Sequence, residues 1–139
     1  MGYKRKAHVL FVGSGDLCRA MMAAAFANSL GQHYMEARAA ALYHDHRPLA
    51  PELLGAMREA GVEMADQILH PFDASNLAWA DLVVTLDEAA DRACPALPEW
   101  VQKRCYPFAH PEDPDSLHRV RDAIKQHVEG MIGGMAMIV

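Results

Sequence analysis

A short segment near the N-terminus combines residue types that bind anions. Gly13 and Gly15 follow an apolar run, and Arg19 lies six residues after Gly13, inside a run of helix-forming residues. A glycine-containing turn between a strand and a helix exposes backbone N–H groups that bind anions, and an arginine adds further donors. Segment 13–19 is therefore a candidate oxyanion site, although glycines after a first strand also serve the turn alone.

The patterns around this segment predict strands that alternate with helices. Short apolar runs rich in β-branched residues predict four strands, the last at a sheet edge because it contains a proline: 7–12, 34–42, 81–86 and 104–107. Helix-forming runs bounded by glycine or proline predict four helices: 18–30, 52–60, a short one from 88, and 115–130. This alternation is typical of an α/β fold with a doubly wound, parallel, four-stranded sheet and helices on both faces. Such sheets bind ligands at the carboxyl ends of their strands, where segment 13–19 would lie.

The composition is that of an ordinary globular protein. The chain has 139 residues, of which 52% are hydrophobic and 22% charged, enough for a proper core. No repeat, low-complexity tract or linker divides the sequence, so we expect a single domain over residues 1–139. The tail 133–139 is apolar after two glycines, and we expect it either to dock on the core or to lie in a homodimer contact.

Charge and cysteine content exclude several classes of protein. A net charge of -5 without a dense Lys/Arg face argues against a nucleic-acid partner. No apolar stretch approaches the roughly 20 residues of a membrane span, and the run 9–12 is a buried strand rather than part of a signal peptide. The cysteines, at 18, 94 and 105, are too few and too scattered for a disulfide scaffold or a zinc ribbon. We therefore expect a soluble, cytoplasmic protein with no nucleic-acid and no membrane partner.

Several segments carry a family resemblance. Residues 9–23 read Val-Leu-Phe-Val-Gly-Ser-Gly-Asp-Leu-Cys-Arg-Ala-Met-Met-Ala, residues 81–86 are followed by Cys-Pro-Ala-Leu-Pro at 94–98, and Glu-Asp-Pro at 112–114 precedes the last helix. Together with the order of residues 28–61, these segments resemble the low-molecular-weight protein tyrosine phosphatases and the thioredoxin-coupled arsenate reductases that share their fold. Segments 81–86 and 94–98 resemble the reductase branch in particular. The resemblance covers nearly the whole chain and implies the fold of this family.

The resemblance implies a role for each position of segment 13–19. In the family a thiolate of low pKa attacks phosphorus or arsenic, loop N–H groups and an arginine hold the oxygens, and an aspartate protonates the leaving group. This implies that Gly13 stands at the position of the nucleophile, Arg19 is the oxyanion clamp and Asp113 is a vestigial general acid. The residues implied to contact the anion are Gly13, Ser14, Gly15, Asp16, Leu17, Cys18 and Arg19.

The departures from the family pattern fall on the reacting groups. Gly13 carries no nucleophile, and the serine that activates the thiolate aligns with Ala20. Asp16 replaces the asparagine that supports the loop, and a carboxylate there would oppose a bound dianion. Of the two resolving cysteines of the reductases, the first aligns with Asp87 and the second with Cys94, which thereby keeps an implied redox role. The resemblance therefore predicts a protein without thiol-based catalysis.

Each of these residues also has a purely structural interpretation. Arg19 would then tie the loop to neighbouring carbonyls or to Asp16, and Asp113 with its proline would be an ordinary turn and helix cap. Cys18 is interpreted as a packed thiol rather than a substitute nucleophile, and Cys94 as a structural thiol. The sequence leaves both sets of roles open.

Histidines suggest one further site. His44, Asp45 and His46 place two imidazoles and a carboxylate next to one another. Neighbouring residues on an extended loop seldom converge on one ion, and the sequence places no further ligand beside them. We interpret this segment as a solvated loop and expect neither a metal nor another cofactor.

Three functions are consistent with these observations. The first is a catalytically silent relative that binds phosphate, sulfate, arsenate or a phosphorylated partner at segment 13–19. The second is an enzyme with faint phosphatase or arsenate reductase activity that uses water, Asp113 or Cys18 in place of the thiolate. The third is a structural or regulatory protein whose surface, with its apolar C-terminus, makes a partner or homodimer contact.

Overall fold

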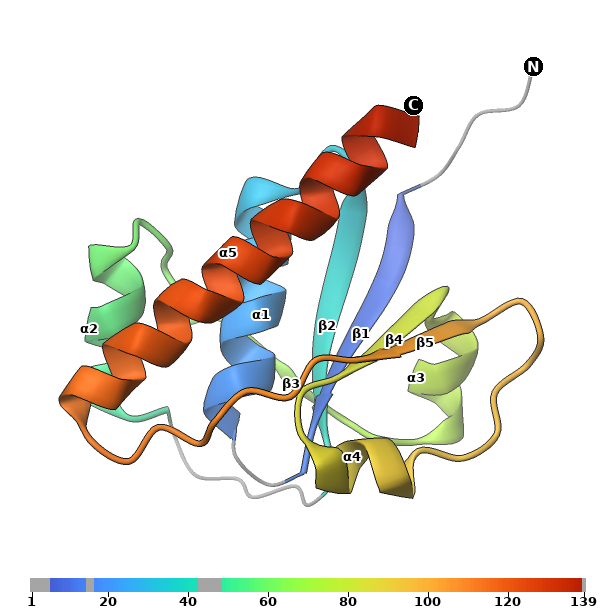
Figure 1. The fold of residues 1–139 in the computed structure, drawn as a ribbon, viewed down its shortest axis with the longest axis horizontal. Coiled ribbons are helices and arrows are strands. Elements are labelled where there is room, and N and C mark those ends of the chain that lie inside the picture. Colours follow the sequence, from blue (N-terminus) through green and yellow to red (C-terminus); the bar gives the residue numbers. More distant parts are fainter. Residues whose placement is uncertain (1–5, 15–16, 43–48, 139) are drawn as a thin grey trace.

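The computed structural model describes residues 6–14, 17–42 and 49–138, with only the backbone described at 17, 18 and 136–138. Its centre is a parallel five-stranded sheet in the order β3-β2-β1-β4-β5 (Figure 1). The strands are β1 (Ala7–Gly13), β2 (Met35–Ala41), β3 (Leu69–Pro71), β4 (Leu82–Thr85) and β5 (Gln102–Cys105). The helices are α1 (Leu17–Leu30), α2 (Pro51–Glu59), α3 (Ala74–Trp79), α4 (Glu88–Ala93) and α5 (Pro114–Ile138). The predicted α/β class and parallel sheet are confirmed.

Helices cover both faces of the sheet, as predicted. α1, α2 and α5 lie on one face, and α3 and α4 lie on the other (Figure 1). Along β1, Val9 and Phe11 belong to the larger buried cluster, which includes residues of α1, α2 and α5. Leu10 and Val12 belong to the smaller cluster on the opposite face. This alternation follows from the two-residue period of a strand whose two faces are both buried.

β1 lies at the centre of the sheet and ends where segment 13–19 begins. It pairs in parallel with β2 on one side and with β4 on the other. Where these ladders end, the N–H of Leu42 donates to the carbonyl of Gly13 at 3.1 Å, and the N–H of Leu86 donates to the carbonyl of Val12 at 2.9 Å. The start of segment 13–19 is thus fixed by backbone hydrogen bonds from both neighbouring strands.

The sheet has one strand more than the four predicted. β3 pairs with β2 over only three residues and ends in Pro71, so it lacks the length and the pattern that mark a strand in a sequence. Helix α3 was also not predicted; it begins where the Asp73 carboxylate accepts a hydrogen bond from the N–H of Asn76 at 2.9 Å. β5 lies two residues earlier than predicted, because its four side chains are all exposed and leave no apolar pattern.

The last helix is longer than predicted. α5 continues past Gly130 and the glycines at 133–134 to Ile138, although each glycine disfavours a helix by about 1 kcal/mol. Ile132 and Met135 pack against the larger buried cluster. The packing of the tail on the core therefore outweighs its low helix propensity.

α5 passes close to Gly31, the residue that follows α1. A Cβ placed on Gly31 would lie 2.9 Å from Cγ1 of Ile132 and 3.0 Å from the carbonyl oxygen of Ala27. Real Cβ atoms rarely make contacts this short, so a side chain at position 31 would push α5 away.

Gly31→Ala should lower the free energy of unfolding by about 1–3 kcal/mol, because the methyl group overpacks the contact with Ile132. The matched control is Gly55→Ala within α2, where an added Cβ meets nothing within 4 Å. Alanine there should stabilise the protein by roughly 1 kcal/mol. Urea denaturation curves measure both changes. A Gly31→Ala midpoint equal to that of the native protein would contradict the close approach.

A charged cluster joins α2 to α5. Nε2 of His118 lies 2.9 Å from Oε2 of Glu59, and its Nδ1 lies 2.6 Å from the carbonyl oxygen of Pro114. Arg121 places Nη1 3.2 Å from the same Glu59 oxygen. The Pro114 carbonyl and Glu59 raise the pKa of His118, while hydrogen bonds from His118 and Arg121 lower the pKa of Glu59. Acceptors at both ring nitrogens thus favour the imidazolium form.

Replacing His118 by glutamine should cost stability mainly in mildly acidic solution. A raised pKa in the folded protein stabilises fully below the unfolded value of about 6.5, and this contribution is lost as the pH rises through the folded pKa. The difference in Tm between the native protein and His118→Gln should therefore be largest near pH 5 to 6 (about one unit below that value) and shrink at higher pH. His33→Gln, at an exposed position elsewhere, is the control. A difference that grows with pH would contradict the assignment.

Candidate oxyanion site

Segment 13–19 lies at the carboxyl end of β1, where the chain passes into α1. Gly13 is the last residue of β1, and Arg19 lies in the first turn of α1. Gly15 and Asp16 lie outside the described residues, and so do the side chains of Leu17 and Cys18. The described part of the site therefore rests on Gly13, Ser14 and Arg19, together with the residues that contact them.

Arg19 is buried, with an exposed fraction of 6%. Its Nη1 donates to the carbonyl oxygen of Phe108 at 2.6 Å, and its Nη2 lies 3.5 Å from Oδ2 of Asp87. Phe108 lies in the connection between β5 and α5, and Asp87 follows β4. The guanidinium thus joins the start of α1 to two segments that are distant in the sequence, one through a backbone carbonyl and the other through a carboxylate.

Asp87 connects the loop to α4. Its Oδ1 accepts from the N–H of Ala90 at 2.7 Å and caps α4, while its Oδ2 accepts from both the N–H and the hydroxyl of Ser14, at 2.9 and 3.0 Å. Burial is the largest single influence on the pKa of Asp87 and raises it, but the hydrogen bonds from Ala90 and Ser14 and the charge of Arg19 together bring it below its ordinary value. The carboxylate is therefore ionised at neutral pH.

Sequence reasoning missed this role of Asp87. The family resemblance accounts for position 87 only as a lost cysteine, and no local pattern links Asp87 to Ser14, 73 residues away. One signal was present: Asp87 directly follows the predicted strand 81–86 and precedes a helix-forming run. A residue there lies at the same sheet edge as Gly13, in the position of a helix cap.

Asp113 has the contacts of a helix cap. Its Oδ1 accepts from the N–H of Ser116 at 2.7 Å at the start of α5, and the Ser116 hydroxyl oxygen accepts from the N–H of Asp113 at 2.9 Å. These hydrogen bonds lower the pKa of Asp113, which is exposed. Asp113 also lines a cavity of about 330 Å³ beside the start of α2, with Leu53 and Leu117 among the other lining residues. An ionised cap is a poor proton donor at neutral pH.

The described cysteines have the surroundings of structural thiols. Cys94 follows α4, is half-buried, and burial is the main cause that raises the pKa of its thiol. A neutral thiol is a weak nucleophile. Cys94 and Cys105 are both free, and Cys105 lies exposed on β5. A redox role of Cys94 stays a prediction, and its protonation state does not favour it.

The described ranges hold neither a metal-binding cluster nor a membrane-spanning helix. Within residues 6–14, 17–42 and 49–138, no group of three or more His, Cys, Asp or Glu side chains could hold a metal ion. The predicted loop around His44 and His46 lies outside these ranges. In the same part of the chain, no helix is long and apolar enough to cross a membrane.

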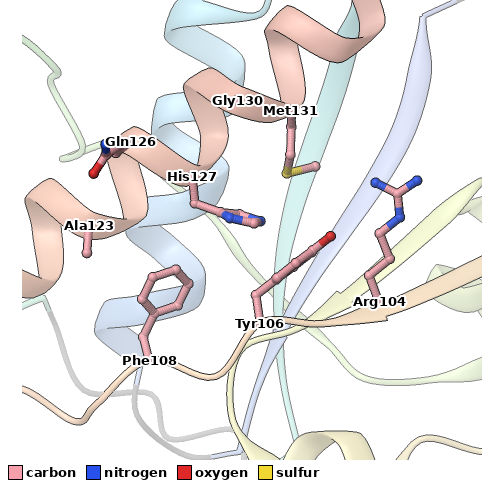
Figure 2. A pocket seen from close by; sticks show the side chains of 8 residues that line it. All are labelled: Arg104, Tyr106, Phe108, Ala123, Gln126, His127, Gly130 and Met131. Carbon is pink, nitrogen blue, oxygen red and sulfur yellow. The ribbon is translucent and has the colours of Figure 1, made fainter.

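A cavity of about 490 Å³ lies between the end of β5 and α5 (Figure 2). The rings of Tyr106 and His127 line this cavity and contact each other, with centroids 3.9 Å apart, and Phe108 meets His127 edge-on at 6.0 Å. Burial and then the charge of Arg104 lower the pKa of His127. Phe108 thus lines this cavity with its ring and holds Arg19 with its carbonyl, so the cavity wall and the candidate site share a residue.

The sequence is similar to low molecular weight phosphatases and arsenate reductases. The family model for low molecular weight phosphotyrosine protein phosphatases matches residues 8–136. Arsenate reductase 2 of Staphylococcus epidermidis is 33% identical over 127 residues, which cover 89% of this chain and 95% of that protein. An arsenate reductase of Bacillus cereus is 30% identical over 128 residues, covering 91% and 94% of the two chains.

Solved structures of arsenate reductases and low molecular weight phosphatases are similar to this chain as well. A structure described as an arsenate reductase in the phosphate binding state superposes with a TM-score of 0.77 at 25% identity, over 93% of this chain and 98% of that one. A low molecular weight protein tyrosine phosphatase from T. tengcongensis gives a TM-score of 0.81 at 20% identity, over 93% and 99% of the chains, and shows the shared fold. Because the family model and the relatives match over nearly its whole length, the chain belongs to the low molecular weight phosphotyrosine protein phosphatase family.

Proposed function

We propose that this protein is a divergent member of its family that binds an oxyanion at segment 13–19 and performs no thiol-based catalysis. One observation carries the proposal: the anion-binding arginine of the motif, Arg19, is retained in a buried position, whereas Gly13 offers no attacking atom. A buried arginine is what an anion-binding site needs. The lack of a nucleophile at Gly13 removes the reaction that the family's motif would otherwise imply.

The surroundings of Arg19 support anion binding. Segment 13–19 joins the central strand to the N-terminus of α1, where backbone N–H groups and the helix dipole favour negative charge. Arg19 is oriented by Phe108 and Asp87, so little conformational freedom is left to lose on binding. The similar solved structure described as an arsenate reductase in the phosphate binding state supports phosphate and arsenate as ligands.

The remaining reactive groups support a catalytically silent protein. The raised pKa of Cys94 keeps its thiol neutral, so it is a poor substitute nucleophile. The lowered pKa of Asp113 keeps that carboxylate ionised, so it holds no proton for a leaving group. We further propose that the chain acts as one domain in the cytoplasm, in line with its few cysteines.

Titration with phosphate or arsenate should shift the NMR resonances of the Ser14 and Arg19 amides at millimolar anion. Arg19→Ala should weaken binding by roughly 10- to 100-fold, the equivalent of one strong charged hydrogen bond. Arg92→Ala, at an exposed position on α4, is the control and should bind like the native protein. Because Arg19 is buried, Arg19→Lys serves as a second variant that keeps the charge and loses the planar fork. A native protein whose resonances do not move at millimolar anion would refute the binding site.

Native protein should not turn over a chromogenic aryl phosphate, whereas the double variant Gly13→Cys plus Ala20→Ser should gain activity. Supplying a covalent nucleophile and its activating hydroxyl is expected to raise kcat on the order of 10³-fold or more. Gly13→Ala plus Ala20→Ser is the matched control without a thiol. Native turnover that disappears in Cys18→Ser would show that a substitute nucleophile acts, and would overturn the silent assignment.

A further inference from the structure

We propose that Asp87 and Ser14 make segment 13–19 select oxyanions that carry a proton. The favoured ligands are then hydrogen phosphate and hydrogen arsenate. The disfavoured ones are sulfate and phosphomonoester dianions, which carry no proton at neutral pH. This inference rests on the oxyanion binding proposed above and names its substrate class.

The cation of the site lies close to a carboxylate. Nη2 of Arg19 lies 3.5 Å from Oδ2 of Asp87. An oxyanion that contacts Nη2 therefore lies beside a carboxylate. Both groups are largely buried, with side-chain exposures of 8% and 12%, so water screens the repulsion between two anions only weakly.

Asp87 carries a negative charge at neutral pH. Its oxygens accept hydrogen bonds from the N–H of Ala90 and from the N–H and hydroxyl of Ser14, all of which favour the ionised form. The ordinary pKa of an aspartate is about 3.9, and that of Asp87 is lowered. At neutral pH the group is therefore an acceptor only, and it has no proton to offer an incoming anion.

The Ser14 hydroxyl donates to Asp87 and can accept from a ligand. A serine hydroxyl has one proton and two lone pairs. Its proton is donated to Oδ2 of Asp87 over 3.0 Å, so the hydroxyl presents lone pairs to anything else that approaches. Ser14 is partly exposed and lies directly after Gly13, so it can meet a ligand of the segment.

Arg19, Asp87 and Ser14 together place one cation next to two hydrogen-bond acceptors. A hydrogen phosphate or hydrogen arsenate can accept from Arg19 through one oxygen while its O–H donates to the Ser14 hydroxyl oxygen. Sulfate has no proton at neutral pH, and a phosphomonoester loses its last proton near pH 6. Sulfate and a phosphomonoester dianion therefore present only unprotonated oxygens to Asp87 and Ser14. No hydrogen bond then offsets the repulsion between the ligand and the Asp87 carboxylate.

The test compares anions and variants by isothermal titration calorimetry at pH 7.5. The native protein should bind phosphate and arsenate at least about tenfold more tightly than sulfate or phenyl phosphate, a difference of one strong hydrogen bond. Asp87→Asn should bring sulfate within about threefold of phosphate, because the amide donates and carries no charge. Asparagine also caps helices well, so α4 should keep its start. Glu88→Gln removes the same charge from an exposed neighbouring residue and should leave the native preference unchanged.

A second measurement needs no variant. In the native protein, phenyl phosphate should bind more tightly as the pH falls from about 8 to 5, through its last ionisation, while sulfate binding changes far less. Equal affinities for phosphate and sulfate, a phenyl phosphate affinity independent of pH, or an Asp87→Asn variant with the native preference would each overturn the selection while leaving oxyanion binding intact. If no anion binds to either the native protein or Asp87→Asn, the proposed function itself is wrong.

Discussion

A buried guanidinium must be neutralised and hydrogen-bonded where it lies, and Arg19 imposes this requirement on three distant parts of the chain. The start of α1 carries the charge, Asp87 after β4 supplies the counter-charge, and the connection that leads to α5 supplies the carbonyl of Phe108. Removing one partner of such a group typically leaves an uncompensated charge in a poorly solvated place. The relative positions of α1, α4 and the approach to α5 are therefore coupled through one side chain.

Carboxylates at the same edge of the sheet are engaged by helix starts. Asp73, Asp87 and Asp113 each accept a hydrogen bond from an N–H of the helix that follows: α3, α4 and α5. Each carboxylate thereby acts as a hydrogen-bond acceptor at the start of a helix. This gives the candidate site a different character from an acid–base centre. Its negative groups hold the starts of the helices, and Arg19 is the group proposed to contact a ligand.

Much of the architecture could be predicted because its elements are long and regular. β1, α1, α2 and β4 show clear apolar runs with glycine or proline at their ends, and the family resemblance placed Arg19 and Gly13 at a strand-to-helix turn. The elements that the sequence predicted poorly are those stabilised by tertiary contacts. β3 is three residues long, β5 has no buried side chain, and the end of α5 is helical because Ile132 and Met135 pack on the core. The partnership of Ser14 with Asp87 was equally hidden, since it depends on strand order and not on spacing.

The two edges of the sheet differ in sequence but resemble each other in one respect. β3 is short and ends in Pro71, and β5 carries Lys103 and Arg104 among four residues that are all exposed. Short strands, proline and positive charge at an edge all disfavour the addition of a foreign strand. Self-association by continuation of the sheet, which is the route to domain swapping and fibres, is thereby discouraged. A homodimer of this protein would instead have to form through side chains, and Trp100, with an exposed fraction of 77%, is the most prominent apolar group available for it among the described residues.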